Sequence, residues 1–107
     1  MKKIYNKLVR DRIPEILEGK ELDFEVSKLN QKDFKLELLN KLVEEVKEVK
    51  ESKDKKELVE ELADVQEVML SIYDAYKIEC SDVTKLARKK RKERGGFTKK
   101  VFLKYVK

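Results

Sequence analysis

Glycine and proline, the residues that most often interrupt helices, are scarce in this chain. Its 107 residues include three glycines and one proline, and none of these four lies between Gly19 and Gly95. Leu, Glu and Lys, which all favour helices, fill much of that interval. A chain of this length forms one domain, so we expect a single all-α domain over residues 1–107.

Capping residues divide the interval into two long helices. Asn30, followed by an aspartate three residues later, predicts a helix that ends near residue 52. Asp54, followed by a glutamate three residues later, resembles a capping box and predicts a second helix that ends near residue 77. The short loop 52–55 between the two helices predicts an antiparallel helical hairpin.

Shorter elements flank the hairpin. Pro14 suits the first turn of a short helix that Gly19 ends. Ser81 predicts the N-cap of a further helix, which a pair of glycines ends. Residues 23–29 alternate in part between apolar and polar side chains, and residues 100–106 are rich in β-prone residues. A short strand pairing between these two segments is therefore a further expectation.

Both long helices are amphipathic. At about 100° per residue, a set of apolar residues falls on one face of each helix. The first helix has Leu38, Leu42, Val46 and Val49, and the second has Leu58, Leu62, Val65, Met69, Ile72 and Tyr76. The second helix has another apolar face, with Val59, Ala63 and Leu70. Because a helix with two apolar faces needs two neighbours, we expect a bundle that association of chains completes.

Four carboxylates border these apolar faces, Glu45 and Glu48 on the first helix and Glu61 and Asp64 on the second. In an antiparallel hairpin about this loop, Glu48 is expected beside Glu61, and Glu45 beside Asp64. Four converging carboxylates repel one another and have raised pKa values unless a cation neutralises them. Oxygen ligands favour a hard cation, which is Mg2+, Mn2+ or Ca2+. The alternative is that some of these acids pair with Lys41, Lys47 or Lys50 at the surface.

Histidine is absent from the chain, which excludes histidine-based zinc sites and histidine-dependent catalysis. Any catalysis therefore depends on carboxylates and cations. The net charge of +5 is unevenly distributed. Residues 15–84 carry twenty acidic and eleven basic side chains, whereas residues 85–107 carry one acidic and eleven basic ones. An acidic middle thus lies between two basic ends.

Apolar runs in the sequence are short. None approaches the roughly 18 residues of a transmembrane helix, and the first residues, MKKIYNKLVRDR, lack the apolar stretch of a signal peptide. The single cysteine, Cys80, cannot form a disulfide within the chain, which fits a reducing compartment. We expect a cytoplasmic protein that does not associate with membranes.

Two motifs on the predicted hairpin resemble those of a known family. Residues 44–48 read EExxE, and residues 61–64 read ExxD. The sequences YNKLVRDRIP at 5–14 and KERGGF at 92–97 add to this pattern. Together they make nearly the whole chain resemble the MazG-like all-α nucleoside triphosphate pyrophosphohydrolase superfamily, in particular its small phosphoribosyl-ATP pyrophosphohydrolase-like members.

The resemblance implies an activity and a set of residues. The family hydrolyses a nucleoside triphosphate to the monophosphate and pyrophosphate with Mg2+, and its members assemble as homodimers or homotetramers. The metal ligands that it implies are Glu45, Glu48, Glu61 and Asp64. Glu44 would help to position or deprotonate water, so Glu44 and Glu45 are the expected catalytic residues. Mg2+ is the expected cofactor with Mn2+ as an alternative, and the base and sugar of the nucleotide stay open.

Basic residues near both ends of the chain are candidates for binding the phosphates of the nucleotide. They are Lys7, Arg10 and Arg12 at one end and Lys92 and Arg94 at the other. Arginine suits bidentate phosphate contacts, and lysine supplies a point charge. Arg10 and Arg94 are favoured because they lie within the family-like motifs, although a solvated surface role is the alternative for each cation. Asn6 can hydrogen-bond a phosphate or a base, or cap a turn.

Two other classes of protein fit parts of the sequence. Seven Lys or Arg residues between positions 85 and 94 indicate a nucleic-acid-binding module, although the acidic helices would repel nucleic acid. A non-catalytic helical interaction protein is the other alternative, and the complete set of four acids argues against it.

Overall fold

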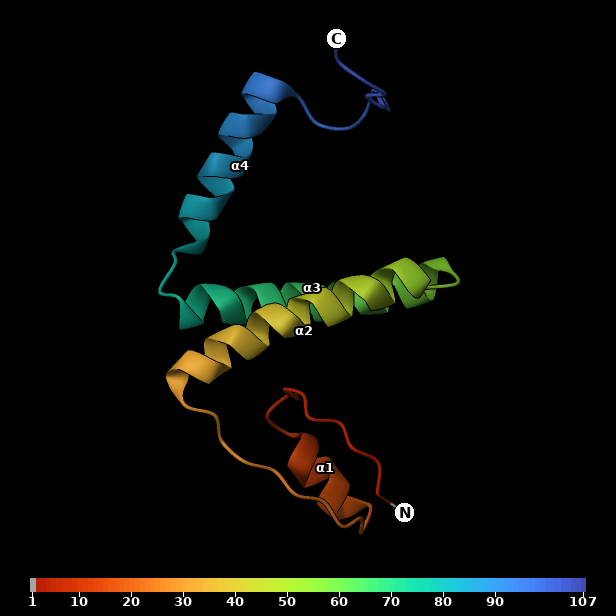
Figure 1. Cartoon of the computed structure of the whole chain (residues 1–107), viewed down its shortest axis with the longest axis vertical. Coiled ribbons are helices and arrows are strands. Elements are labelled where there is room, and N and C mark those ends of the chain that lie inside the picture. Colours follow the sequence, from red (N-terminus) through yellow and green to blue (C-terminus); the bar gives the residue numbers. More distant parts are fainter. Residues whose placement is uncertain (1) are drawn as a thin grey trace.

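The computed structural model describes residues 2–107, and this range contains four α-helices. α1 spans Ile13–Gly19, α2 spans Gln31–Glu51, α3 spans Lys55–Ala75 and α4 spans Cys80–Arg94. The all-α class expected from the sequence is confirmed. No strand occurs within residues 2–107. Segments 23–29 and 100–106 lie at opposite ends of the molecule, so their expected pairing is not observed within the single chain (Figure 1).

The expected caps start both long helices. The side-chain oxygen of Asn30 accepts a hydrogen bond from the backbone N–H three residues later, at 2.8 Å. Asp54 accepts the equivalent bond at the start of α3, also at 2.8 Å. At the end of α2, the hydroxyl of Ser52 donates to the carbonyl oxygen of Val49 at 2.7 Å. These bonds satisfy helix-end groups that would otherwise lack partners, and those of Ser52 and Asp54 lie at the two sides of the hairpin loop.

The expected N-cap of the last helix is wrong. α4 begins at Cys80, and Glu79 rather than Ser81 is its N-cap, without a side-chain capping bond. The backbone N–H of Asp82 already bonds to the carbonyl of Glu79 at 3.0 Å, so the chain turns helically before Ser81. The backbone therefore starts this helix without help from a capping side chain.

α2 and α3 pack against each other as the antiparallel hairpin that the sequence predicts (Figure 1). The buried side chains are Leu38 and Glu45 on α2 and Val68 and Ala75 on α3. On each helix the two buried positions are seven residues apart, which is the spacing of a coiled-coil seam. The expected apolar faces are partly wrong, because Val46, Leu62 and Met69 are exposed. The buried face of each helix is displaced toward the acids, so Glu45 lies within the seam between α2 and α3 rather than at its border.

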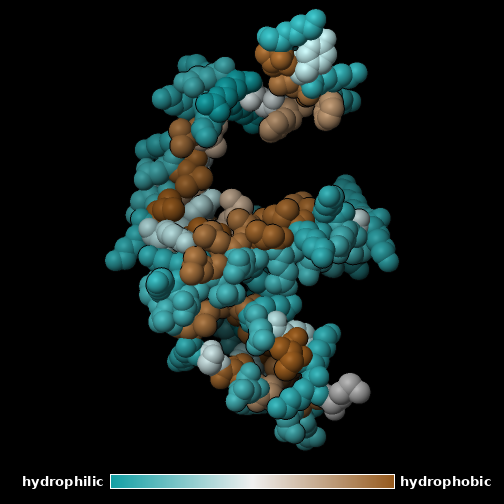
Figure 2. All heavy atoms as spheres, in the orientation of Figure 1, coloured by the Kyte–Doolittle hydropathy of each residue, from teal (hydrophilic) through white to brown (hydrophobic). Residues whose placement is uncertain are grey.

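The single chain is open rather than closed into a bundle. Its radius of gyration is 18.3 Å, whereas a compact domain of this length has about 13 Å. α4 leads away from the hairpin, and apolar side chains line the notch between α3 and α4 (Figures 1 and 2). Many large apolar side chains are exposed, including Leu70, Leu86 and Phe102. Within residues 2–107, no helix has both the length and the apolar character that crossing a membrane requires.

Candidate functional site

In the half of the hairpin nearer its loop, three carboxylates from both helices converge. One oxygen each from Glu45 of α2 and from Glu61 and Asp64 of α3 lies within 4.8 Å of the other two. We call these three residues the acid cluster. Glu45 is 6% exposed, and Glu61 and Asp64 are half-buried. Glu45 and Asp64 therefore meet as the antiparallel register predicts.

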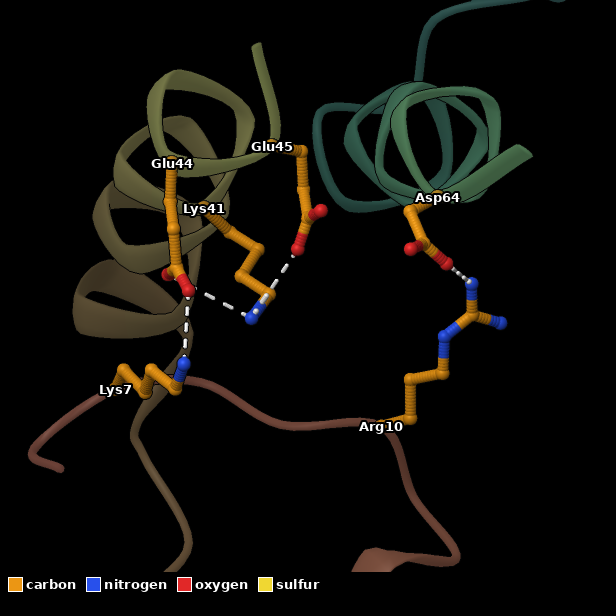
Figure 3. Close-up of polar contacts among 6 residues, drawn as sticks. All are labelled: Lys7, Arg10, Lys41, Glu44, Glu45 and Asp64. Atoms are coloured by element: carbon orange, nitrogen blue, oxygen red, sulfur yellow. Dashed lines mark hydrogen bonds and ion pairs between the residues drawn. The ribbon is translucent and has the colours of Figure 1, made fainter. Parts of the chain in front are cut away.

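Two oxygens of the acid cluster lack a hydrogen-bond donor. Oε2 of Glu45 and Oε2 of Glu61 are buried and have no hydrogen-bond partner in the part of the chain that the structure describes. Figure 3 shows the Glu45 carboxyl between the two helices, with one oxygen toward Lys41 and the other toward α3. A buried acceptor without a partner costs free energy. The acid cluster therefore offers oxygens that a positively charged group can satisfy.

The fourth predicted ligand, Glu48, lies beside the acid cluster. Burial raises the pKa of Glu48, and the neighbouring carboxylate of Glu61 raises it further. Burial likewise raises the pKa of Glu45, with a smaller contribution from the charge of Glu48. Glu48 is half-buried and adjoins Glu61, as the register predicts, but it is not part of the three-ligand group. A bound cation would lower the free energy of carboxylates that are destabilised in this way.

Lys41 is the cation closest to the buried seam of α2. Its ammonium lies 3.4 Å from Oε1 of Glu45 and 3.6 Å from Oε2 of Glu44. The Lys41 side chain is 16% exposed, and it lies on the face of α2 that the N-terminal segment covers. Lys41 was expected only as a possible surface partner of the acids. Its spacing of four residues before Glu45 is the signal that could have revealed the contact.

The N-terminal segment, residues 2–12, carries two further cations to the hairpin (Figure 3). The ammonium of Lys7 donates to Oε1 of Glu44 at 2.8 Å, and the guanidinium of Arg10 donates to Oδ1 of Asp64 at 2.6 Å. The bond from Lys7 lowers the pKa of Glu44, and it raises the pKa of Lys7. Glu44 is therefore held ionised between two lysines, at the edge of the acid cluster.

The other predicted phosphate-binding cations lie elsewhere. Arg12 pairs with Glu15 at 3.1 Å, at the start of α1. Lys92 and Arg94 are exposed on the last turn of α4, and this helix leads away from the hairpin (Figure 1). Of the predicted cations, the single chain thus brings Lys7 and Arg10 to the acids and leaves the α4 pair apart from them.

A hollow of about 250 Å³ adjoins the acid cluster. It lies between the N-terminal segment and α2, and we call it the N-terminal hollow. Its lining consists of Asn6, Lys7, Leu8, Glu37, Asn40, Lys41 and Glu44. Asn6 has a left-handed backbone with φ of 43°, a conformation that asparagine tolerates better than most residues. Leu8, Glu37 and Asn40 were not expected at a site, because no pattern along the sequence shows where an irregular segment will lie.

Comparisons with known proteins give no match. The chain matches no family model, no curated protein and no solved structure. The acid cluster and its surrounding cations are therefore the basis on which function is inferred.

Proposed function

We propose that this chain is a metal-dependent nucleoside triphosphate pyrophosphohydrolase of the MazG-like class. Water attacks the α-phosphorus, the bond from that phosphorus to the bridging oxygen breaks, and the products are a nucleoside monophosphate and pyrophosphate. The observation that carries the proposal is the pair of buried, unpartnered oxygens of Glu45 and Glu61 beside Asp64. The EExxE and ExxD motifs supply these residues and direct the proposal to this class.

The acid cluster fits a hard divalent cation. Glu45, Glu61 and Asp64 would hold Mg2+, with Glu48 adjacent as a fourth carboxylate and Mn2+ as the alternative ion. All the donors are carboxylate oxygens, and their repulsion favours a bound cation. Mg2+ bound there would offset the charge of the triphosphate and lower the pKa of a bound water.

The carboxylates of the chain divide the remaining tasks. Glu44 is held ionised by Lys7 and Lys41, so it can accept a hydrogen bond from the attacking water and orient it. Its lowered pKa makes it a weak proton acceptor. Glu45 is the other proposed catalytic residue, because it would hold the cation that lowers the pKa of this water.

Lys7 and Arg10 are the proposed phosphate-binding cations of the same chain. Both approach the acids from the N-terminal segment, and both now pair with carboxylates. A cation at the acid cluster would weaken the hold of Asp64 on Arg10, and the guanidinium would then be free to bind a phosphate in bidentate fashion. Asn6 adjoins Lys7 and completes this end of the site.

The proposal includes a homodimer or homotetramer. The open shape of the single chain and its exposed apolar side chains support association. Lys92 and Arg94 are apart from the acids of their own chain, so they would bind phosphates at the acid cluster of another chain. A second copy would also cover the exposed face of α3, where Leu62 and Leu70 lie.

The test is release of pyrophosphate from a panel of ribonucleoside and deoxyribonucleoside triphosphates with Mg2+. We expect release from at least one nucleotide, and loss of release when the metal is chelated. Glu45→Gln and Glu61→Gln should each abolish release while circular dichroism shows unchanged helicity. Glu60→Gln is the matched control, because Glu60 is exposed on the same helix as Glu61. Equal activity of the wild type and both cluster variants would overturn the proposal.

A second candidate function is nucleic-acid binding by α4. Its last two turns present exposed cations, and Phe97, which is 97% exposed, lines a hollow of about 680 Å³ beside Lys90 and Arg91. Exposed cations next to an aromatic ring are typical of surfaces that bind single strands. Binding to random-sequence DNA should then weaken steeply with added salt. Binding that is undetectable at physiological ionic strength would remove this candidate.

A further inference from the structure

The N-terminal hollow shares a wall with the proposed catalytic site. Lys41 lines the hollow, and its ammonium lies 3.4 Å from Oε1 of Glu45 in the acid cluster. Glu44 also lines the hollow, and it is the proposed residue that orients water. A ligand seated in the hollow would therefore extend directly over the edge of the acid cluster.

The lining of the hollow suits an uncharged group. Lys7 and Lys41 are offset in charge by Glu37 and Glu44, so the hollow itself has no excess positive charge for a phosphate, and Lys7 would meet the phosphates only at its edge. Asn6 and Asn40 add amides, each of which can donate and accept hydrogen bonds. Leu8 adds an apolar surface. A flat ring with a polar edge and apolar faces matches this combination.

The size of the hollow limits what it can receive. Its volume is about 250 Å³, which is below the roughly 300–1,000 Å³ of pockets that enclose a whole drug-sized ligand. One ring system fits, and a complete nucleoside triphosphate does not. The sugar and phosphates of a nucleotide would have to lie outside the hollow, on the side of the acid cluster.

We propose that the N-terminal hollow binds the nucleobase of the substrate and that Asn6 and Asn40 read the hydrogen-bonding edge of that base. This inference rests on the proposed pyrophosphohydrolase function, because it places the phosphates over the acid cluster. Asn40 lies on α2, one turn before Glu44, so the helix fixes the distance between base recognition and the chemistry. Asn40 donates a hydrogen bond to Glu37 at 3.4 Å, and its amide is exposed to an incoming ring.

The first test measures base preference as kcat/KM across nucleoside triphosphates that differ in the base. Asn40→Leu should lower kcat/KM for the preferred nucleotide about fivefold to tenfold, the loss expected for one hydrogen bond. The loss should appear in KM, with kcat within about twofold of the wild type. The reason is that the bound substrate and the transition state would lose the same hydrogen bond. Gln66→Leu removes an exposed amide from α3 and should keep the wild-type preference. Unchanged base preference in Asn40→Leu would overturn the assignment.

The second test does not depend on catalysis. Adenosine, guanosine, cytidine and uridine, which lack phosphate, are titrated into the metal-free protein while NMR follows the side-chain amide signals. At least one nucleoside should shift the signals of Asn6 and Asn40 and leave that of Gln66 unchanged. Asn6→Gly, which tolerates the left-handed backbone, should weaken the effect. No shift with any of the four nucleosides would reject the base site.

The two tests separate failure of this inference from failure of the proposed function. A wild-type protein that hydrolyses no nucleotide but shows these amide shifts contradicts the pyrophosphohydrolase proposal and keeps the base site. A protein that releases pyrophosphate equally well from every nucleotide, without amide shifts, keeps the enzyme and rejects the base site.

Discussion

The guanidinium of Arg10 lies 2.6 Å from the carboxylate of Asp64, although 54 residues separate them in the sequence. This ion pair ties an irregular N-terminal segment to the middle of α3 and places a cation at the edge of the acid cluster (Figure 3). A divalent cation at the cluster would share Asp64 with Arg10 or displace it. The pair therefore couples the N-terminal segment to metal binding.

Removing this guanidinium should change metal binding in a defined direction. Arg10→Met should destabilise the metal-free protein by about 0.2–1 kcal/mol, because the ion pair is partly exposed. Asp64 then has no competing partner, so Mg2+ should raise the Tm of this variant more than that of the wild type. Arg12→Met is the control, since Arg12 pairs with Glu15 away from the cluster. A smaller Mg2+ effect in Arg10→Met than in the wild type would contradict competition at Asp64.

Neutralising the buried acid should separate folding from metal binding. Glu45→Gln keeps the shape of the side chain and removes a charge that burial and Glu48 both disfavour. The metal-free variant should melt at or above the Tm of the wild type, and the rise in Tm with Mg2+ should be lost. Thermal melts with and without Mg2+ measure both effects. A variant that is clearly less stable without metal would show that Glu45 is stabilising in its charged form.

The raised pKa of Glu45 predicts how metal-free stability depends on pH. Its pKa in the unfolded chain is near the ordinary 4.5, so above that pH the folded chain holds more protons than the unfolded one. The stabilisation of the folded chain that this shift supplies is fully present below pH 4.5. It is lost as the pH rises through the pKa of Glu45 in the folded chain. Glu44 has a lowered pKa and acts in the opposite direction, losing its contribution as the pH falls.

The difference in the free energy of unfolding between the wild type and Glu45→Gln, measured from thermal melts across a range of pH, isolates this dependence. The difference should favour the wild type most at low pH and decline as the pH rises. The stabilisation by Mg2+ should grow over the same interval, because the metal needs ionised carboxylates. A difference that grows with rising pH would show that Lys41, 3.4 Å away, outweighs burial.

Association of the chain should depend on the exposed face of α3. Leu70 is 46% exposed on this face. Leu70→Glu should shift the molar mass measured by light scattering toward that of a single chain, because a charge there opposes burial. Lys56→Glu changes an exposed position of the same helix and should leave the mass unchanged. A wild-type protein that is a single chain at all concentrations would remove the assembly from the proposed function.

Much of the fold could be predicted because its signals are local. Asn30 and Asp54 cap the helices at the expected places, since a capping bond spans only three residues. The short loop then fixes the antiparallel register of α2 and α3, and this register predicts that Glu45 lies near Asp64. The apolar faces were less predictable, because a small rotation of each helix decides whether Leu62 or Glu61 turns inward.

The candidate site divides in the same way. The sequence by itself determined the four helices, the hairpin register and the set of acids beside the seam, because these depend on short-range spacing. Only the tertiary structure decided that Glu45 is buried with one oxygen unpartnered and that Lys7 and Arg10 reach the acids. An irregular segment carries no periodicity that fixes its path, so its position follows from long-range charge pairing rather than from local propensity.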